Sequence, residues 1–306
     1  MLVIGSRGSQ LALWQAQWIA ARLAEDGHET RIDIIKTTGD KITDVPLAKV
    51  GTKGLFTKEI EEALLDGRID LAIHSLKDLP TEIPAGLTIA AVPEREDPRD
   101  AMVGTRLSEL PEGAKVGTSS LRRAAQLRMV RPDLAIESVR GNLDTRVRKL
   151  DEGQYRAIVL AAAGLTRLGW AHRIAEILSP EVMCPAVGQG ALAVETRREG
   201  EARDICGVLD HAATRAVVTA ERAVLAALGG GCQVPIGAHA VIEGDSLRLV
   251  GAVIAPDGDR MVRKSDGGAV ADAAEIGRRL GEALLIDGAR EILDQVYGAP
   301  VRDAAV

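Results

Sequence analysis

Basic side chains recur at turns in the middle third of the chain, close to where helices are expected to begin. They are Arg122, Arg123, Arg140, Arg146, Arg148 and Arg167. A cation at a helix N-terminus opposes the helix dipole at a cost of roughly 0.3 to 1 kcal/mol, whereas an anion is held there by free backbone N–H groups together with the guanidinium. The repetition therefore predicts several bound carboxylates or phosphates. The alternative is a solvated basic surface, balanced by Asp133, Asp144 and Asp151.

The first third of the chain holds further groups of this kind. Arg7 and Ser9 follow an expected strand, and Lys53 lies close to Phe56, the only phenylalanine of the sequence. Lys53 belongs to the segment 37–54, which has three glycines, a proline and no sustained periodicity. A long segment of this type can serve as a cover over an anionic ring compound. An ordinary loop that Phe56 anchors to the core fits the same residues.

The stretch IDLAIHSLKDLP places Ser75, Lys77 and Asp78 in the turn after a strand expected over 69–74. In open α/β sheets, ligands bind at the carboxyl ends of the strands. Nearby positive charge keeps a carboxylate ionised, so Asp78 can stabilise a developing cation or hold a ring N–H. Asp78 can equally cap a helix or pair with Lys77. His74 precedes this turn, and a single histidine at a strand end is more often structural.

The three cysteines fall into two groups. Cys184 and Cys206 lie beside apolar residues and are expected to fill core space. Cys232 lies in GGGCQVP, where three glycines and a proline predict a tight, irregular loop that leaves the sulfur accessible. An accessible thiol can be a nucleophile, an attachment point or simply a tolerated side chain.

Composition excludes several classes of protein. Aromatic residues make up 2% of the 306 residues, and 38 Lys and Arg against 44 Asp and Glu give a formal charge of −6, so neither base stacking nor a basic surface indicates nucleic acid. No spacing typical of a metal site, a nucleotide loop or a hydrolase nucleophile occurs. A polar N-terminus, the lack of a long apolar stretch and three cysteines favour a cytoplasmic protein with no membrane partner.

Short apolar runs alternate with helical patterns through the first two thirds of the chain, which predicts an α/β fold with a mainly parallel sheet. Strands are expected over 1–4, 31–36 and 69–74, and Ser9 is expected to cap a helix. A later core repeats a unit of strand, small-residue turn and helix start, in AKVGTSSLRR, LAIESVRGNLDTRVRK and YRAIVLAAAGLTRLG.

Two segments are expected to connect the domains. Charge and proline concentrate in VPEREDPRD over 92–100, and 183–195 is interpreted as a strand that returns to the first domain. From about Val234, alternating strands and two helical stretches predict a small α+β domain. The expected domains are 1–93 with 188–208, then 97–184, then 212–306.

Eight motifs occur in an order and spacing that resemble one known family. They are TTGD, PLAKVGTKGLFTKEIE, HSLKDLP, EREDPRDA, GTSSLRR, RGNLDTR, PAVGQGA and GGCQVPIG. Their order is similar to that of the porphobilinogen deaminases, also called hydroxymethylbilane synthases, from Ile4 to Tyr297. The resemblance implies two lobes built like type II periplasmic binding proteins, with the active site in their cleft, and a small α+β C-terminal domain.

The resemblance also implies a reaction and a cofactor. Members of this family are transferases of porphyrin, haem and tetrapyrrole biosynthesis that condense four porphobilinogens head to tail, with loss of ammonia each time, and release 1-hydroxymethylbilane by hydrolysis. A dipyrromethane cofactor, held by a thioether to the position of Cys232, remains attached as the primer, and no metal is required. We expect a cytoplasmic monomer with porphobilinogen and its oligopyrrole intermediates as partners.

The same resemblance assigns roles to individual residues, because each pyrrole carries an acetate and a propionate that need cationic partners. The implied catalytic residues are Asp78, which stabilises the azafulvenium-like cation left when ammonia departs, and Lys77. The implied cofactor-binding residues are Cys232, Ser9, Lys77, Asp78, Thr118, Ser119, Ser120, Arg122, Arg123, Arg140 and Gly141. The implied substrate-binding residues are Arg7, Gln15, Lys53, Phe56, Arg140, Arg146 and Arg167, with Phe56 in the mobile cover.

A second hypothesis comes from a different class of protein. A solute-binding protein of the same two-lobed type would bind a small organic polyanion without chemistry. Such a protein gives no reason for Cys232 or for a third domain, and it usually needs a signal peptide. A covalently bound dipyrrole would separate the two hypotheses.

Overall fold

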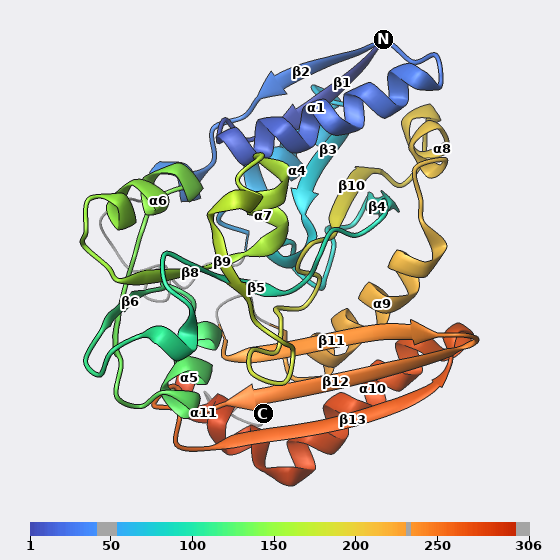
Figure 1. Ribbon diagram of the computed structural model, residues 1–306. Coiled ribbons are helices and arrows are strands. Elements are labelled where there is room, and N and C mark those ends of the chain that lie inside the picture. Colours follow the sequence, from blue (N-terminus) through green and yellow to red (C-terminus); the bar gives the residue numbers. More distant parts are fainter. Residues whose placement is uncertain (42–53, 231–233, 298–306) are drawn as a thin grey trace, which may run out of the picture.

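The computed structural model describes residues 1–41, 54–230 and 234–297 of the chain. In this part of the chain the strands form three sheets, which are separated in space (Figure 1). Two of the sheets belong to α/β lobes and the third belongs to a smaller α+β domain. The expected α/β lobes and small α+β domain are therefore confirmed. The expectation of a mainly parallel sheet is wrong, because each lobe has a mixed sheet with two parallel and two antiparallel pairings.

The first lobe is built around a mixed sheet. Its strands, in spatial order, are β2 (Thr30–Ile34), β1 (Leu2–Ser6), β3 (Leu71–Ser75), β10 (Leu192–Arg197) and β4 (Leu87–Ala91). β1 runs parallel to β2 and β3, whereas β10 runs antiparallel to β3 and β4. The strands predicted over 1–4, 31–36 and 69–74 are confirmed, with ends that differ by at most two residues.

Helices and a short turn complete the first lobe. In the described residues these are α1 (Gln10–Glu25), α2 (Thr38–Lys41), α4 (Lys58–Leu65), α8 (Glu201–Gly207) and the 3-10 turn η1 (Leu76–Asp78). Ser9 caps α1 as predicted, because its Oγ accepts a hydrogen bond from the backbone N–H of Ala12 at 3.3 Å. η1 follows directly on β3, so its polar side chains lie at the carboxyl end of a central strand.

The second lobe repeats one local unit. Its strands, in spatial order, are β7 (Ala135–Glu137), β6 (Lys115–Gly117), β8 (Ala157–Ala161), β5 (Asp100–Val103) and β9 (Ile174–Ile177). Its described helices and turns are α5 (Leu121–Val130), α6 (Leu143–Asp151), α7 (Ala162–Arg167), η2 (Leu107–Glu109) and η3 (Ala171–Arg173). β6, β7 and β8 are each followed by a helix, so the predicted repeat of strand, turn and helix is confirmed.

Two connections join the lobes. The first runs from β4 to β5 through the charged segment 92–99, and the second runs from β9 back to β10. β10 pairs with β3 from Leu192 to Thr196, so the chain returns to the first sheet, as 183–195 predicts. Residues of both connections lie side by side between the lobes, where Nε2 of Gln189 donates to the backbone oxygen of Pro98 at 2.7 Å.

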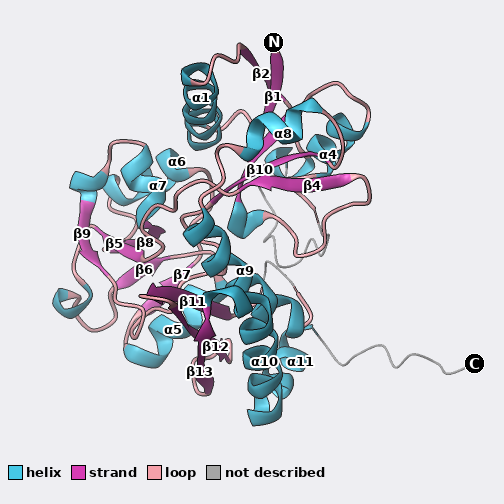
Figure 2. Ribbon diagram, turned by 90° about the vertical axis from the view of Figure 1, so that its right-hand side faces the viewer, coloured by secondary structure: helices cyan, strands magenta, loops and turns pink. Residues whose placement is uncertain are grey.

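The third domain is an antiparallel sheet covered by helices. Its elements in the described residues are α9 (Ala212–Ala227), β11 (Ile236–Glu243), β12 (Ser246–Ile254), β13 (Met261–Ala269), α10 (Ala273–Leu284), α11 (Arg290–Tyr297) and the short turns η4 (Val270–Asp272) and η5 (Leu285–Ala289). Figure 2 shows the helices grouped beside the sheet. Leu76 and Leu79 of the first lobe pack in the same core as Val218 and Leu225 of α9, so this domain is fixed to the first lobe by apolar contact.

Two properties of the described residues bear on the classes of protein considered above. None of their helices has both the length and the apolar content that a bilayer crossing requires. Cys184 and Cys206 are free and fully buried, as expected for core residues. Burial raises the pKa of both thiols to about 12, so neither is a ready nucleophile.

Candidate active site

A buried carboxylate, Asp100, lies where the two lobes meet. Its Oδ2 accepts a hydrogen bond from Nη1 of Arg122 at 2.7 Å, and its Oδ1 accepts from Nε of Arg123 at 2.8 Å. Nε2 of Gln189 donates to the same Oδ1 at 2.9 Å. Asp100 and Gln189 have no exposed surface, and the two arginines are 4% and 6% exposed. The start of α5 is thereby bound to both connections between the lobes.

The charges of this cluster do not cancel. Burial opposes ionisation of Asp100, but Arg122 and Arg123 hold the pKa of its carboxyl well below the usual range. Burial also lowers the pKa of Arg123, because the charged guanidinium has lost water. One carboxylate faces two guanidinium groups, so a positive charge is left over where the two lobes meet.

Lys77 adds a further cation to the same place. Its Nζ donates to Oε1 of Gln189 at 3.4 Å, and Nη2 of Arg123 donates to that oxygen at 3.3 Å. The pKa of Lys77 is lowered to about 8, mainly by burial and also by the charge of Arg123. The charges of Asp78 and Asp100 oppose this shift. A lysine of the first lobe and an arginine of the second lobe therefore share one neutral acceptor.

Asp78 is exposed beside these cations. It lies at the end of η1, which projects from the carboxyl end of β3. Its charge also acts on Arg146 of α6, whose pKa burial lowers to about 10 with the help of Arg123 and Arg140. Nε of Arg146 donates to the backbone oxygen of Gly141 at 2.8 Å, rather than to a carboxylate. A carboxylate of the first lobe thus interacts electrostatically with Lys77 beside it and with Arg123 and Arg146 of the second lobe.

Arg167 reaches from the second lobe toward the returning connection. Its Nη2 donates to the backbone oxygen of Gly190 at 2.6 Å, and its guanidinium carbon lies 5.9 Å from the ring centroid of Trp14 on α1. Burial lowers the pKa of Arg167 to about 10, and Glu96 opposes the shift. Arg167 is therefore a further cation whose loss of water is incompletely compensated.

The predicted placement of the arginines at helix starts is partly wrong. Arg122 and Arg123 are in the first turn of α5, and Arg140 precedes α6. Arg148 and Arg167, however, lie in the last turns of α6 and α7. α7 begins directly after β8 with no connecting turn, so Arg167 falls at its C-terminal end, where the helix dipole favours a cation.

The turn between β6 and α5 carries the small polar side chains of the predicted cofactor site. Oγ of Ser120 accepts from the N–H of Arg123 at 3.4 Å and caps α5, and Oγ1 of Thr118 accepts from the N–H of Ser120 at 3.2 Å. Ser119 is exposed and donates to the backbone oxygen of Val139 at 2.7 Å. These bonds fix the turn that presents Arg123.

The backbone before α6 is constrained in a different way. Gly141 has a φ of +108°, which a residue with a side chain rarely adopts, and an added Cβ would lie 2.6 Å from Cγ2 of Thr145. A glycine is therefore required between Arg140 and the start of α6. The tight turn carries Arg140 and Arg146 on the same short stretch of chain.

The first lobe contributes a wall to the same region. The guanidinium carbon of Arg7 lies 4.2 Å from the ring centroid of Phe56, so these two predicted substrate residues are in contact. Gln15 is buried, and its Nε2 donates to Oγ of Ser75 at 2.9 Å, immediately before η1. Ser9 is used as the cap of α1.

Some predicted site residues lie outside the described residues. They are Lys53 and Cys232, together with residues 42–53 of the segment expected to act as a cover. His74, by contrast, is described: it is buried, and its Nε2 lies 2.9 Å from Oε2 of Glu195. A histidine held in this way fits the structural role expected for it.

Sequence reasoning missed two members of the site, Asp100 and Gln189. Both belong to quoted motifs, EREDPRDA and PAVGQGA, so each was visible as part of the family pattern. Their pairing was not visible, because Gln189 and Asp100 are 89 residues apart in the chain. The adjacent Arg122 and Arg123 gave the one usable signal in the sequence. If both are buried, they need a buried carboxylate as their counter-charge.

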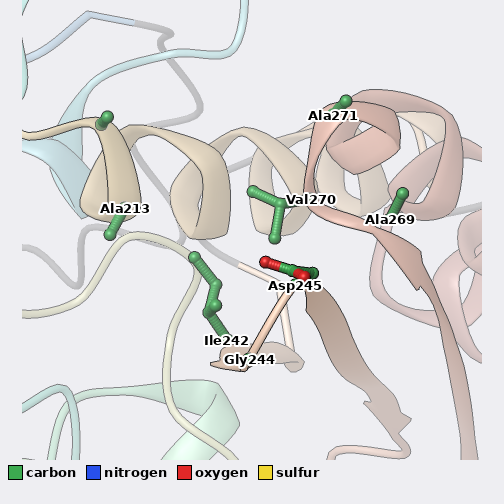
Figure 3. A pocket seen from close by; sticks show the side chains of 8 residues that line it. Ala213, Ile242, Gly244, Asp245, Ala269, Val270 and Ala271 are labelled. Carbon is green, nitrogen blue, oxygen red and sulfur yellow. The ribbon is translucent and has the colours of Figure 1, made fainter.

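A pocket on the third domain has a different character (Figure 3). It lies between the start of α9 and the turn from β11 to β12, with Asp245, Ile242 and Val270 among its lining side chains. The lining residues that the structure describes include a carboxylate and no cation. This pocket is unsuited to a polyanion, whereas the cleft between the lobes is suited to one.

Two family models match this chain. Residues 2–204 match the family model described as "Porphobilinogen deaminase, dipyromethane cofactor binding domain", and residues 216–286 match "Porphobilinogen deaminase, C-terminal domain". Among solved structures, a periplasmic substrate-binding protein of an ABC transporter from Coxiella burnetii is 12% identical, with a TM-score of 0.43 over 68% of this chain and 92% of that chain.

Curated relatives match over nearly the whole length. The porphobilinogen deaminase of Nitratidesulfovibrio vulgaris strain Hildenborough is 54% identical over 99% of this chain and 98% of its own. That of Geobacter sulfurreducens is 52% identical over 97% of this chain and 95% of its own. Since both family models match in order and these relatives align from end to end, the chain belongs to the porphobilinogen deaminase family.

Proposed function

We propose that the chain condenses four porphobilinogen molecules head to tail, with loss of ammonia at each addition, and then releases 1-hydroxymethylbilane by hydrolysis. The observation that carries this proposal is the set of cations between the lobes whose charge burial penalises, together with the exposed Asp78 beside Lys77. Lys77, Arg146 and Arg167 all have lowered pKa values because burial penalises their charge. Bound carboxylates would remove that penalty, and every pyrrole of the substrate carries two.

The donor set also fits a dipyrromethane cofactor. Its acetate and propionate groups match the hydroxyls of the turn before α5 and the cations behind that turn. The residues that we assign to cofactor binding are Ser9, Lys77, Asp78, Thr118, Ser119, Ser120, Arg122, Arg123, Arg140 and Gly141. When bound, the cofactor supplies the primer on which the new chain is extended. We assign its covalent attachment, by a thioether, to Cys232.

Asp78 is the residue to which we assign catalysis. An ionised carboxylate at a fixed place lowers the energy of a positive charge that develops on the substrate when ammonia leaves. The exposure of Asp78 at the end of η1 leaves its carboxylate accessible to the substrate. Lys77 lies beside Asp78. We propose that its ammonium group orients the carboxylates of the bound pyrroles.

The remaining cations are assigned to the substrate and the growing chain. Arg7 and Phe56 lie in contact on the first lobe, and Gln15 bonds to Ser75 at the end of β3. Arg146 and Arg167 belong to the second lobe, and Arg167 reaches the backbone oxygen of Gly190. Lys53 and Arg140 complete the proposed set. Cations on both walls allow carboxylates of successive rings to bind to either lobe, which a chain of increasing length requires.

We further propose that the protein acts as a monomer in the cytoplasm. Each residue assigned above comes from the same chain, so the proposed site needs no second copy. Cys184 and Cys206 are free thiols, which suits a reducing compartment. The division into 1–93 with 188–208, 97–184 and 212–306 is part of the same proposal, and the order of the three sheets along the chain supports it.

Intact-mass measurement of the purified protein tests the proposal, with Ehrlich's reagent as a second readout for pyrroles. We expect a mass increase equal to one dipyrromethane and a positive colour reaction. Cys232→Ser should fold but lack both signals and all turnover, because an alcohol in this position does not form the thioether. Cys206→Ser, which changes a buried thiol elsewhere, serves as the matched control and should remain loaded. A dipyrrole retained in Cys232→Ser would refute the assignment.

A further inference from the structure

The third domain contacts the proposed catalytic turn through one arginine of α9. Nη1 of Arg222 donates to the backbone oxygen of Leu79 at 3.1 Å, and Nη2 donates to that of Pro80 at 2.6 Å. These two carbonyls directly follow Asp78 in the chain. A guanidinium can bind two neighbouring acceptors with its two terminal nitrogens, which fixes their direction as well as their distance.

The same turn is held from its apolar side by the same helix. The N–H of Leu79 closes η1 on the backbone oxygen of Leu76 at 3.2 Å, and both leucines are 1% exposed. They pack in one core with Val218 and Leu225 of α9. The apolar half of η1 is thus buried against the third domain, while its polar half faces the cleft.

The C-terminal end of α9 runs close to the segment that follows the turn. Gly230, just after the helix, has a φ of +52°, and an added Cβ there would lie 2.9 Å from Oγ1 of Thr81. The N–H of Gly230 donates to the backbone oxygen of Leu225 at 2.8 Å, which fixes this residue to the helix end. One helix therefore contacts 79–81 both at its middle and at its end.

From these contacts we propose that Arg222 is a positioning residue for the known reaction of the family, which sets the place of Asp78 relative to the cleft. The proposal rests on the catalytic role of Asp78 proposed above. The two bonds given above go to the backbone directly after Asp78, so in this proposal Arg222 acts through the position of Asp78. A misplacement of about 1 Å at a reacting group can reduce turnover by as much as about 100-fold. Loss of the two hydrogen bonds from Arg222 to Leu79 and Pro80 can therefore have a measurable effect on turnover.

The test compares two variants of Arg222 with a matched control. Arg222→Met keeps the apolar stem and removes both donors, and Arg222→Lys keeps a charge that reaches one carbonyl. Arg263 on β13 provides the control, because it forks in the same way to the backbone oxygens of Glu181 and Pro180 at 3.1 and 3.2 Å, across the interface with the second lobe. Cofactor loading by intact mass, thermal midpoint, kcat and KM are measured for each.

We expect Arg222→Met to be loaded and folded, with KM unchanged and kcat lowered by about 10- to 100-fold. Arg222→Lys should have a kcat between those of Arg222→Met and the unmodified chain. If Arg222→Met does not fold, the kcat of Arg222→Lys is measured in its place. Arg263→Met should keep its kcat within about twofold of the unmodified chain. A normal kcat in Arg222→Met, an equal loss in Arg263→Met or an unloaded Arg222→Met would each overturn the inference.

A double variant identifies the group through which Arg222 acts. In an Asp78→Asn background, single-turnover rates should show no further loss on Arg222→Met, since the charge to be positioned is absent. Losses that multiply would mean that Arg222 acts elsewhere, and the inference would fail. Full turnover of Asp78→Asn alone would instead refute the proposed role of Asp78, so the two failures are distinguishable.

Discussion

Gln189 and Asp100 connect the two chain segments that pass between the lobes. Nε2 of Gln189, on the returning segment, donates to Oδ1 of Asp100 at 2.9 Å, at the first residue of β5. The same Nε2 donates to the backbone oxygen of Pro98 at 2.7 Å on the outgoing segment. Both crossings are therefore bound at one point, and that point also carries the cations of the proposed site.

Asp100→Asn should destabilise the protein strongly. Asparagine keeps the size of the side chain but leaves Arg122 and Arg123 buried without their counter-charge, which costs about 3 to 5 kcal/mol of unfolding free energy in buried pairs of this type. Urea unfolding measures the change. Asp133→Asn, which breaks a more accessible pair with Arg131, is the control and should change the stability far less. An equal loss of unfolding free energy in both variants would show that the buried cluster contributes no more to stability than the accessible pair.

The contribution of Asp100 should also depend on pH. Its folded pKa lies well below the unfolded value near 3.8, so its stabilisation is fully present above that value and is lost as the pH falls below it. The difference in unfolding free energy between the unmodified chain and Asp100→Asn should therefore shrink on acidification. A difference that stays constant down to about pH 3 would contradict the depressed pKa.

Lys77 should give a pH dependence of the same sign as Asp100, but in the alkaline range. Its folded pKa is about 8 and its unfolded value is 10.5, so between these values the unfolded chain binds more protons and stability rises with pH. In Cys232→Ser, which we expect to lack cofactor carboxylates, this rise should be visible by urea unfolding and absent after Lys77→Met. Lys115→Met, at an exposed pair with Glu137, should leave the rise in place. Its persistence in Lys77→Met would exclude Lys77 as the source.

How well the sequence predicted a structural feature depends on how far apart in the chain the interacting residues lie. Ser9 and Ser120 cap their helices through neighbours three residues away, so local pattern was sufficient to place the strands, the helices and the repeat of the second lobe. The counter-charge of Arg122 lies 22 residues away, on strand β5 of the same lobe, and periodicity carries no information on that pairing. Arg167 was misplaced because α7 begins directly after β8 with no side-chain cap to mark its start, so Arg167 falls in its last turn.

Asp78→Asn should reduce turnover by at least about 100-fold while substrate binding changes less, because the amide keeps size and hydrogen bonding but cannot stabilise a developing cation. Single-turnover kinetics separate the chemical step from binding. Asp144→Asn removes an exposed carboxylate from α6 and is the matched control, with turnover expected to be unchanged. Near-normal turnover in Asp78→Asn would reduce Asp78 to a residue that shapes the turn.

The cations should divide by the carboxylates that they bind. Arg123 lies behind the turn of Ser119 and Ser120, where we place the cofactor, whereas Arg167 lies at the returning segment beside Trp14. Arg123→Leu should therefore yield mostly unloaded protein. Arg167→Leu should yield a loaded protein that stalls with intermediates bound.

Native mass spectrometry after addition of limited porphobilinogen resolves the successive additions in each variant. Arg123 is also paired with Asp100, so loss of loading in Arg123→Leu has to be separated from loss of folding. Arg123→Lys keeps a positive charge beside Asp100 but cannot reproduce the fork to Val159 and Gln189, and it should fold while loading less cofactor. If both leucine variants load equally and show the same series of additions, the cleft is a diffuse basic surface without separate cofactor and substrate anchors.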